Sequence, residues 1–197
     1  MSRKHFVIIV CGLGDKELGL RIATRHFRLH GLTPVVHLIG WHSEETDFVP
    51  KLDRLIALID LCAQDGNRVS LIGTSAGASA VLNAFVQRKD VVNKVISVTG
   101  VLRPSVEKGW RSFETRTKSS RPFAQSVTLF VSKEQTLSKA DRKRIMTIYP
   151  KFGDELVAPD TATLDAAVNI QIPTTEHVLS IGLALTVFSG PIFKFLQ

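Results

Sequence analysis

The sequence predicts an α/β fold in which a mostly parallel sheet of about six strands has helices on both faces. Short, continuous apolar runs alternate along the chain with segments of helical periodicity. Continuous apolar runs are typical of strands buried on both faces, and strands that alternate with helices pair in parallel. At 197 residues, 44% of them hydrophobic and 22% charged, the chain has the size and composition of one globular domain, residues 1–197.

The expected strands are short runs rich in branched apolar side chains. They cover residues 6–10, 35–39, 69–72, 91–98, 144–149 and 168–172. The first run, FVIIV, contains no polar residue and ends at the glycines of Cys11-Gly12-Leu13-Gly14. Such a run predicts a strand in the middle of the sheet.

The expected helices lie between these strands and have apolar residues three or four positions apart. They cover residues 18–29, 50–63, 76–86, 122–130 and 161–167, and His177 opens a terminal helix. Residues 178–195 are almost long enough and apolar enough to span a bilayer, but Gly190-Pro191 would break a helix there. We therefore expect a buried amphipathic helix and no membrane span.

The positive charge is concentrated in one segment. Residues 101–145 contain eleven Lys or Arg and four Asp or Glu, which equals the net charge of +7 of the whole chain. The rest of the chain has no net charge, and this argues against nucleic-acid binding. The segment is either a solvated stretch or a surface with weak attraction for anionic substrates or membrane surfaces.

The cysteine content indicates a reducing compartment. Cys11 and Cys62 cannot form a disulfide framework, and the apolar run after the basic N-terminus is too short for a signal peptide. Both observations favour a cytoplasmic protein.

A G-x-S-x-G pentapeptide, Gly73-Thr74-Ser75-Ala76-Gly77, lies between the third expected strand and the helix that follows it. In this strand–turn–helix context the motif forms a nucleophile elbow. A sharp turn exposes the Ser75 hydroxyl, and only small neighbours fit between the strand and the helix. The backbone N–H of Ala76, at the helix start, is directed at the oxyanion that develops during attack.

A nucleophilic serine needs a base and an acid that orients the base. His177 follows the sixth expected strand, and Asp154 lies in the turn that leaves the fifth. Asp160 and Asp165 are rivals of Asp154, which alone follows the strand immediately. The chain order Ser75, Asp154, His177 is the order expected for an α/β-hydrolase.

With these residues the chain resembles a compact α/β-hydrolase, a serine hydrolase with a Ser-Asp-His triad, over most of its length. The resemblance implies a parallel sheet, ester-type substrates, no cofactor, no metal and an acyl-enzyme intermediate. It makes Ser75 the nucleophile, His177 the base and Asp154 the orienting acid.

The sequence departs from the family pattern in two places. Many members have His-Gly at the oxyanion loop, where this chain has Cys11-Gly12-Leu13-Gly14; the glycines remain, so the N–H of Leu13 or Gly14 is expected to be the second oxyanion donor. Thr74 precedes the serine, where His or an aromatic residue is common. The antiparallel hairpin that often precedes the first parallel strand is not evident, which makes this a minimal version of the fold.

Two other interpretations of the whole chain were weighed. A dinucleotide-binding protein would need a third glycine where Glu17 stands and an acid after the second strand, and neither is present. A non-catalytic module that binds small molecules or proteins on a hydrolase scaffold stays open, because fold does not establish activity. The predicted function is a serine hydrolase that cleaves a small-molecule carboxylic ester or thioester.

Other residues near the predicted site have two interpretations each. His37 and His42 follow the second strand and either line the pocket or lie at the surface. Cys11 is either a second nucleophile or, as its position at a strand end favours, a buried thiol.

The segment over residues 101–125 also has two interpretations. Its bulky side chains Trp110, Phe113 and Phe123 either form a small cap that shields the acyl pocket or sit in the core of a crossover connection.

Overall fold

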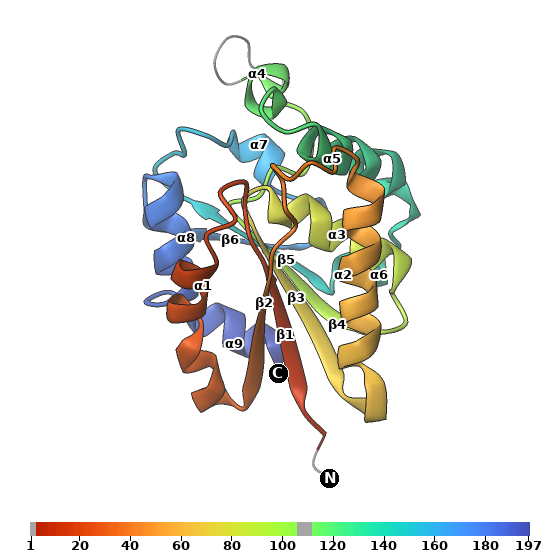
Figure 1. The fold of residues 1–197 in the computed structure, drawn as a ribbon. Helices are drawn as coiled ribbons and strands as arrows, with labels where there is room; N and C mark the ends of the chain where they lie inside the picture. The colour runs from red at the N-terminus through yellow and green to blue at the C-terminus, as the bar shows by residue number, and fades with distance from the viewer. Residues whose placement is uncertain (1–2, 106–111) are drawn as a thin grey trace.

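The computed structural model describes residues 3–105 and 112–197, which form one α/β unit (Figure 1). All six strands belong to one parallel sheet with the order β2-β1-β3-β4-β5-β6. The strands are β1 (His5–Val10), β2 (Leu32–His37), β3 (Arg68–Thr74), β4 (Val92–Val98), β5 (Ile145–Pro150) and β6 (Val168–Ile172). The predicted fold class is therefore confirmed.

Helices cover both faces of the sheet (Figure 1). One face packs on α2 (Phe48–Cys62), α3 (Gly77–Gln87) and α5 (Arg121–Lys133), and the other on α1 (Glu17–Ala23), the 3-10 helix η1 (Arg25–His30), α8 (His177–Leu185) and α9 (Gly190–Leu196). Shorter helices are α4 (Phe113–Thr117), α6 (Lys139–Arg142) and α7 (Pro159–Ala162), with 3-10 turns η2 (Gln64–Gly66) and η4 (Glu134–Thr136).

Strand β1 explains why the core has two halves. Successive side chains of a strand point to opposite faces. Ile8 and Val10 therefore join the cluster under α2, α3 and α5, whereas Val7 and Ile9 join the cluster under α1, α8 and α9. All four side chains are fully buried, as the uninterrupted apolar run predicts.

The helix expected over residues 18–29 is two shorter elements. α1 ends at Ala23 and η1 begins at Arg25, and the backbone of Thr24 between them leaves the helical region at φ −102° and ψ 3°. The Thr24 hydroxyl donates to the Leu20 carbonyl oxygen at 2.7 Å. A hydroxyl that bonds the preceding turn weakens a helix locally, and the periodicity of apolar residues continues through the break and hides it.

The terminal helix expected over residues 178–195 is also two elements. α8 ends at Leu185, and α9 starts at Gly190 with Pro191 in its first turn. Proline suits the first turn of a helix because it needs no N–H partner there, so Gly190-Pro191 begins the second helix. Among the described residues no single helix has the length and apolarity to cross a membrane; α8 and α9 meet the criterion only together, with a 57° bend between them.

The described part of the predicted cap packs partly into the core. Phe123, on α5, is buried and meets the Trp41 ring edge-to-face with 5.9 Å between centroids. Phe113, on α4, is half-buried against the same cluster. These positions are what the crossover interpretation expects for the two rings. Trp110 lies outside the described residues, and the cap stays a prediction.

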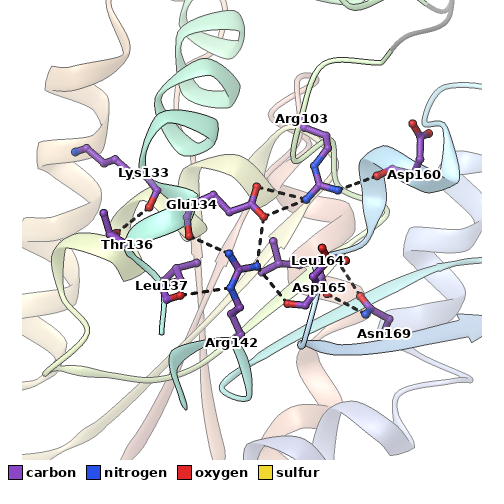
Figure 2. A network of polar contacts seen from close by, with 10 residues as sticks. All are labelled: Arg103, Lys133, Glu134, Thr136, Leu137, Arg142, Asp160, Leu164, Asp165 and Asn169. Carbon is purple, nitrogen blue, oxygen red and sulfur yellow. Dashed lines mark hydrogen bonds and ion pairs between the residues drawn. The ribbon is translucent and has the colours of Figure 1, made fainter. Parts of the chain in front are cut away.

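A polar network, here called the Arg142 network, joins segments that are distant in the sequence (Figure 2). The Arg142 guanidinium contacts the Glu134 carboxylate at 3.3 Å and donates to the Asp165 carbonyl oxygen at 3.2 Å. Arg103 contacts the same carboxylate at 3.3 Å and donates to the Asp160 carbonyl oxygen at 3.2 Å. Arg103 and Arg142 therefore fix the chain that follows β5, and this accounts for part of the basic character of residues 101–145.

Candidate active site

Ser75 occupies the sharp turn between β3 and α3. Its φ of +50° lies in the left-handed region, and its N–H donates to the Val98 carbonyl oxygen at 2.9 Å. A Cβ on Gly73 would lie 2.4 Å from the Gly77 carbonyl oxygen, and a Cβ on Gly77 would lie 2.5 Å from the Val10 carbonyl oxygen. Both glycines of the pentapeptide are thus required by close backbone contacts, and the turn leaves Ser75 at the carboxyl end of β3.

Ser75, His177 and Asp154 form one hydrogen-bonded chain. His177 Nε2 lies 2.9 Å from Ser75 Oγ, and His177 Nδ1 lies 2.8 Å from Asp154 Oδ2. The side chains of His177 and Asp154 are only 4% and 3% exposed. A carboxylate accepts only, so Nδ1 is the donor, and Nε2 is left with the lone pair that a general base needs.

The loop after β5 holds the Asp154 carboxylate in place. Asp154 Oδ1 accepts from the backbone N–H groups of Leu156 at 2.7 Å and Val157 at 3.0 Å. These two donors occupy one carboxylate oxygen and leave the other for His177. The rivals Asp160 and Asp165 lie in the Arg142 network, where their backbone carbonyls are used (Figure 2).

Two glutamates fix the start of α8 and thereby His177. The His177 N–H donates to the Glu155 carboxylate at 3.1 Å. Glu176 caps the helix by accepting from the N–H of Val178 at 3.0 Å, and it also accepts from the N–H of Leu179. These backbone donors lower the pKa of Glu176. The base thus lies at a helix terminus secured by hydrogen bonds to three consecutive backbone N–H groups.

The predicted oxyanion donors lie beside Ser75 and are free. A Cβ on Gly12 would lie 3.0 Å from Ser75 Cβ, so the loop over residues 11–15 packs directly against the serine. Among residues 3–105 and 112–197, no acceptor binds the N–H groups of Leu13, Gly14 or Ala76. Backbone donors with no partner next to a nucleophile are suited to a developing oxyanion.

Sequence analysis missed the residues that hold this loop. Trp41 donates its backbone N–H to Asp15 Oδ2 at 3.0 Å and its indole N–H to the Cys11 carbonyl oxygen at 3.1 Å. The pKa of the Asp15 carboxyl is raised, because the effect of burial exceeds that of the backbone N–H donors, which lower it. Asp15 has a positive φ of 43°. Aspartate adopts such a φ more often than most residues, so an aspartate in a Gly-rich turn is a weak sequence signal for this conformation.

The other residues singled out near the site are separate from the triad. Burial raises the pKa of Cys11 to about 12, with Asp15 and Glu17 adding to the rise, so Cys11 is a fully buried thiol at neutral pH. His37 is half-buried at the end of β2 and His42 is exposed, and neither lines the pocket beside Ser75.

A pocket of about 430 Å³ opens beside Ser75 and His177. Its walls are the oxyanion loop, α1 and α8, and most of its side chains are apolar. Volumes of roughly 300–1,000 Å³ are usual for small-molecule sites. Within the described residues, no group of three or more His, Cys, Asp or Glu side chains is arranged to hold a metal ion.

Comparisons with known proteins give structural similarity without sequence similarity. No family model and no curated protein matches the sequence. The solved structure of Est1E from Butyrivibrio proteoclasticus is similar with a TM-score of 0.66 at 12% identity, over 100% of this chain and 88% of that one. The enol-lactonase from Burkholderia xenovorans has a TM-score of 0.66 at 11% identity, over 99% and 92%.

A lipase-esterase related protein from Clostridium acetobutylicum is similar to the same degree, with a TM-score of 0.65 at 13% identity over 98% of this chain and 93% of that one. Identities this low establish the fold and leave the activity to be argued from the site. Together with the parallel sheet and its strand order, they show that the chain has the α/β-hydrolase fold.

Proposed function

We propose that this protein is a serine hydrolase that cleaves carboxylic esters or thioesters through an acyl-enzyme intermediate. The observation that supports it most strongly is the hydrogen-bonded chain from Asp154 through His177 to Ser75 Oγ, with distances of 2.8 and 2.9 Å. Structures with the same fold include Est1E, a lipase-esterase related protein and an enol-lactonase, so this fold is compatible with ester cleavage.

In the first half-reaction Ser75 Oγ attacks the carbonyl carbon while His177 Nε2 takes the hydroxyl proton. The carbonyl oxygen becomes an oxyanion, which the N–H groups of Ala76 and of Leu13 or Gly14 stabilise. Collapse of the tetrahedral intermediate breaks the bond to the leaving group, which receives the proton from His177. The alcohol or thiol departs and the acyl group stays on Ser75.

In the second half-reaction water replaces the leaving group. His177 Nε2 takes a proton from the water as the water oxygen attacks the acyl carbon. The second tetrahedral intermediate then collapses, the bond between the acyl carbon and Ser75 Oγ breaks, Oγ receives the proton from His177, and the carboxylic acid departs. Asp154 keeps the Nδ1 proton in place and stabilises the imidazolium that forms twice in each cycle. Removing a single oxyanion donor costs about 3 kcal/mol of transition-state stabilisation in a comparable site, so the free backbone N–H groups are a substantial part of the proposal.

The test combines active-site labelling with turnover. A fluorophosphonate probe should form a covalent adduct on Ser75, and p-nitrophenyl esters should be hydrolysed. The variant Ser75→Ala should lose both the adduct and the hydrolysis. Ser132→Ala, at an exposed position of α5, is the matched control and should keep both.

Two outcomes would overturn the proposal. An adduct mapped by mass spectrometry to a different residue would reject Ser75 as the nucleophile. A folded wild-type protein with neither label nor turnover would favour the non-catalytic binding module. A parallel assay with acyl thioesters, in which the released thiol is measured, decides between the two bond types.

A cytoplasmic location stays a prediction.

A further inference from the structure

The pocket beside Ser75 is built from one face of each of two helices. At α1 and its N-cap the lining residues follow a spacing of three or four, and at α8 the same spacing recurs over about two and a half turns. They are Lys16, Gly19, Leu20 and Ala23 on the first wall and His177, Val178, Ile181, Gly182 and Leu185 on the second. Residues spaced in this way share one face of a helix. The pocket, here called the channel, therefore extends from Ser75 and His177 along α8 as far as Leu185.

Gly19 and Gly182 stand inside these two helices without a structural reason. Glycine is the least favourable residue in a helix interior apart from proline. A Cβ on either glycine would meet no atom within 4 Å, and neither has a positive φ. The glycines of the nucleophile turn are different, because there a Cβ would collide with backbone. Both glycines line the pocket, where Gly19 is exposed and Gly182 is half-buried, and what each supplies there is open space.

The chemistry of the walls selects an apolar occupant. Leu20 and Leu185 are buried at the back of the pocket. Leu13, Leu156 and Ile181 add apolar surface to the lining, and Val178 on α8, which also lines the pocket, is 61% exposed. Large apolar side chains that gather around a concave site mark a surface for an apolar ligand.

We infer that this channel binds an aliphatic chain of the substrate and that Gly19 and Gly182 determine the length of chain that fits. The inference rests on the proposed function, because the channel begins at Ser75 and His177. Gly19 and Gly182 are specificity-determining residues, and neither takes part in the chemical steps. The chain belongs to the acyl group or to the alcohol of the ester, and two substrate series separate these sources.

The first series is a set of p-nitrophenyl esters with acyl chains that lengthen from acetyl to dodecanoyl. The second is a set of acetate esters of alcohols of the same lengths. In the series that occupies the channel, kcat/KM should rise about fourfold for each methylene group until the channel is full, as expected for burial of apolar surface. A flat profile in both series would reject the channel.

The variants Gly19→Leu and Gly182→Leu test the role of the glycines. Each should move the optimum of the responsive series to shorter chains and lower kcat/KM for the longest esters by at least tenfold. The readout is the ratio of kcat/KM for the longest ester to kcat/KM for the acetyl ester, which should fall in both variants. Both variants should be at least as thermally stable as the wild type, because leucine is a good helix former. Ala57→Leu, at an exposed position of α2, adds a leucine away from the pocket and should leave the profile unchanged.

A binding measurement separates failure of this inference from failure of the proposed function. The variant Ser75→Ala cannot turn over ester, yet its melting temperature should rise on addition of 1-decanol, and the rise should be lost when Gly182→Leu is added. If the alcohol binds and no ester is cleaved by the wild type, the channel stands and the hydrolase proposal falls. The inference would be overturned if the folded variants Gly19→Leu and Gly182→Leu kept the wild-type chain length of highest kcat/KM and still bound 1-decanol.

Discussion

The indole N–H of Trp41 donates to the carbonyl oxygen of Cys11 at 3.1 Å, from a ring that is only 1% exposed. Cys11 follows β1 directly and begins the loop that contains the predicted oxyanion donors Leu13 and Gly14. The Trp41 carbonyl oxygen in turn accepts from the hydroxyl of Ser120, the N-cap of α5, at 2.9 Å. Trp41 therefore connects the oxyanion loop to α5, in one of the two helical layers that cover the sheet.

This connection predicts the effect of Trp41→Phe. The ring keeps most of its packing, but the Cys11 carbonyl loses its donor, and a buried acceptor without a partner costs about 1–3 kcal/mol of stability. Because the loop loses one of its two hydrogen bonds from Trp41 and keeps the backbone bond to Asp15, we expect kcat to fall about tenfold, a fraction of what complete loss of an oxyanion donor causes. KM should change little.

The control for Trp41→Phe is Phe123→Leu, which removes a ring that packs on Trp41 and leaves the three Trp41 hydrogen bonds in place. This variant should lower the melting temperature without the fall in kcat. Equal loss of stability with equal kcat in the two variants would show that Trp41 has only a packing role.

The left-handed backbone of Ser75 predicts that the nucleophile position is strained. A residue other than glycine in a sparsely populated backbone region costs on the order of 1–3 kcal/mol. We therefore expect Ser75→Gly to melt at a higher temperature than Ser75→Ala, although both should lose hydrolysis by roughly the 10⁶-fold seen for nucleophile removal in a serine protease. Differential scanning calorimetry on the two variants checks the order. The control position is Ser132, on an exposed face of α5. There Ser132→Gly should instead melt at a lower temperature than Ser132→Ala.

The hydrogen bonds of Asp154 predict the effect of its amide. In Asp154→Asn, the amide oxygen still accepts from Leu156 and Val157, so the amide NH₂ faces His177 Nδ1. The imidazole then carries its proton on Nε2 and cannot accept one from Ser75. We expect kcat to fall about 10⁴-fold with little change in stability, as in the template case.

Asp160→Asn and Asp165→Asn are the matched controls, since both residues contribute backbone carbonyls to the Arg142 network. Their turnover should stay within a fewfold of the wild type. A greater loss in either one than in Asp154→Asn would remove Asp154 from the triad.

A half-buried histidine at the other end of the sheet predicts sensitivity to acid. His5 Nε2 lies 2.9 Å from the hydroxyl of Ser70, and burial, with a smaller effect of Arg68, lowers the pKa of His5 to about 4. The unfolded chain binds a proton at His5 near pH 6.5, and the folded chain does so only near pH 4. The free energy of unfolding should therefore decrease as the pH falls from 6.5 to 4.

Urea denaturation across this pH range measures the effect. His5→Asn should show a smaller decrease, whereas Lys4→Asn, which leaves His5 in place, should follow the wild type. Parallel pH profiles for His5→Asn and the wild type would contradict the prediction.

The sequence analysis could predict that Ser75, Asp154 and His177 lie close together, as they do in the structure, for a topological reason. Ser75, Asp154 and His177 follow three parallel strands, and the carboxyl ends of parallel strands meet at one edge of the sheet. Local sequence is therefore enough to place them together. Trp41 and Asp15 were missed because their hydrogen bonds join residues 26 and 30 positions apart, and no local pattern marks such contacts.

The errors in the helices have a different origin. Apolar periodicity predicts which face of a segment is buried, and it remains correct when the axis bends. It therefore continued through Thr24 and through the break after Leu185, where a side-chain hydrogen bond and a change of direction end the regular helix. The start of β2 at Leu32 is set by pairing with His5 of β1, which is information from outside the segment.

Helix α8 unites two tasks that many sites divide between separate elements. Its first residue is the proposed base, and its next two turns form a wall of the channel. A displacement of about 1 Å between reacting groups can cost on the order of 100-fold in rate, so α8 cannot move outward to admit a bulkier chain without drawing Nε2 away from Ser75. We therefore expect substitutions that admit new substrates to exchange side chains on α8 without moving the helix. Displacements of the backbone are expected at α1, which contains none of the three proposed catalytic residues.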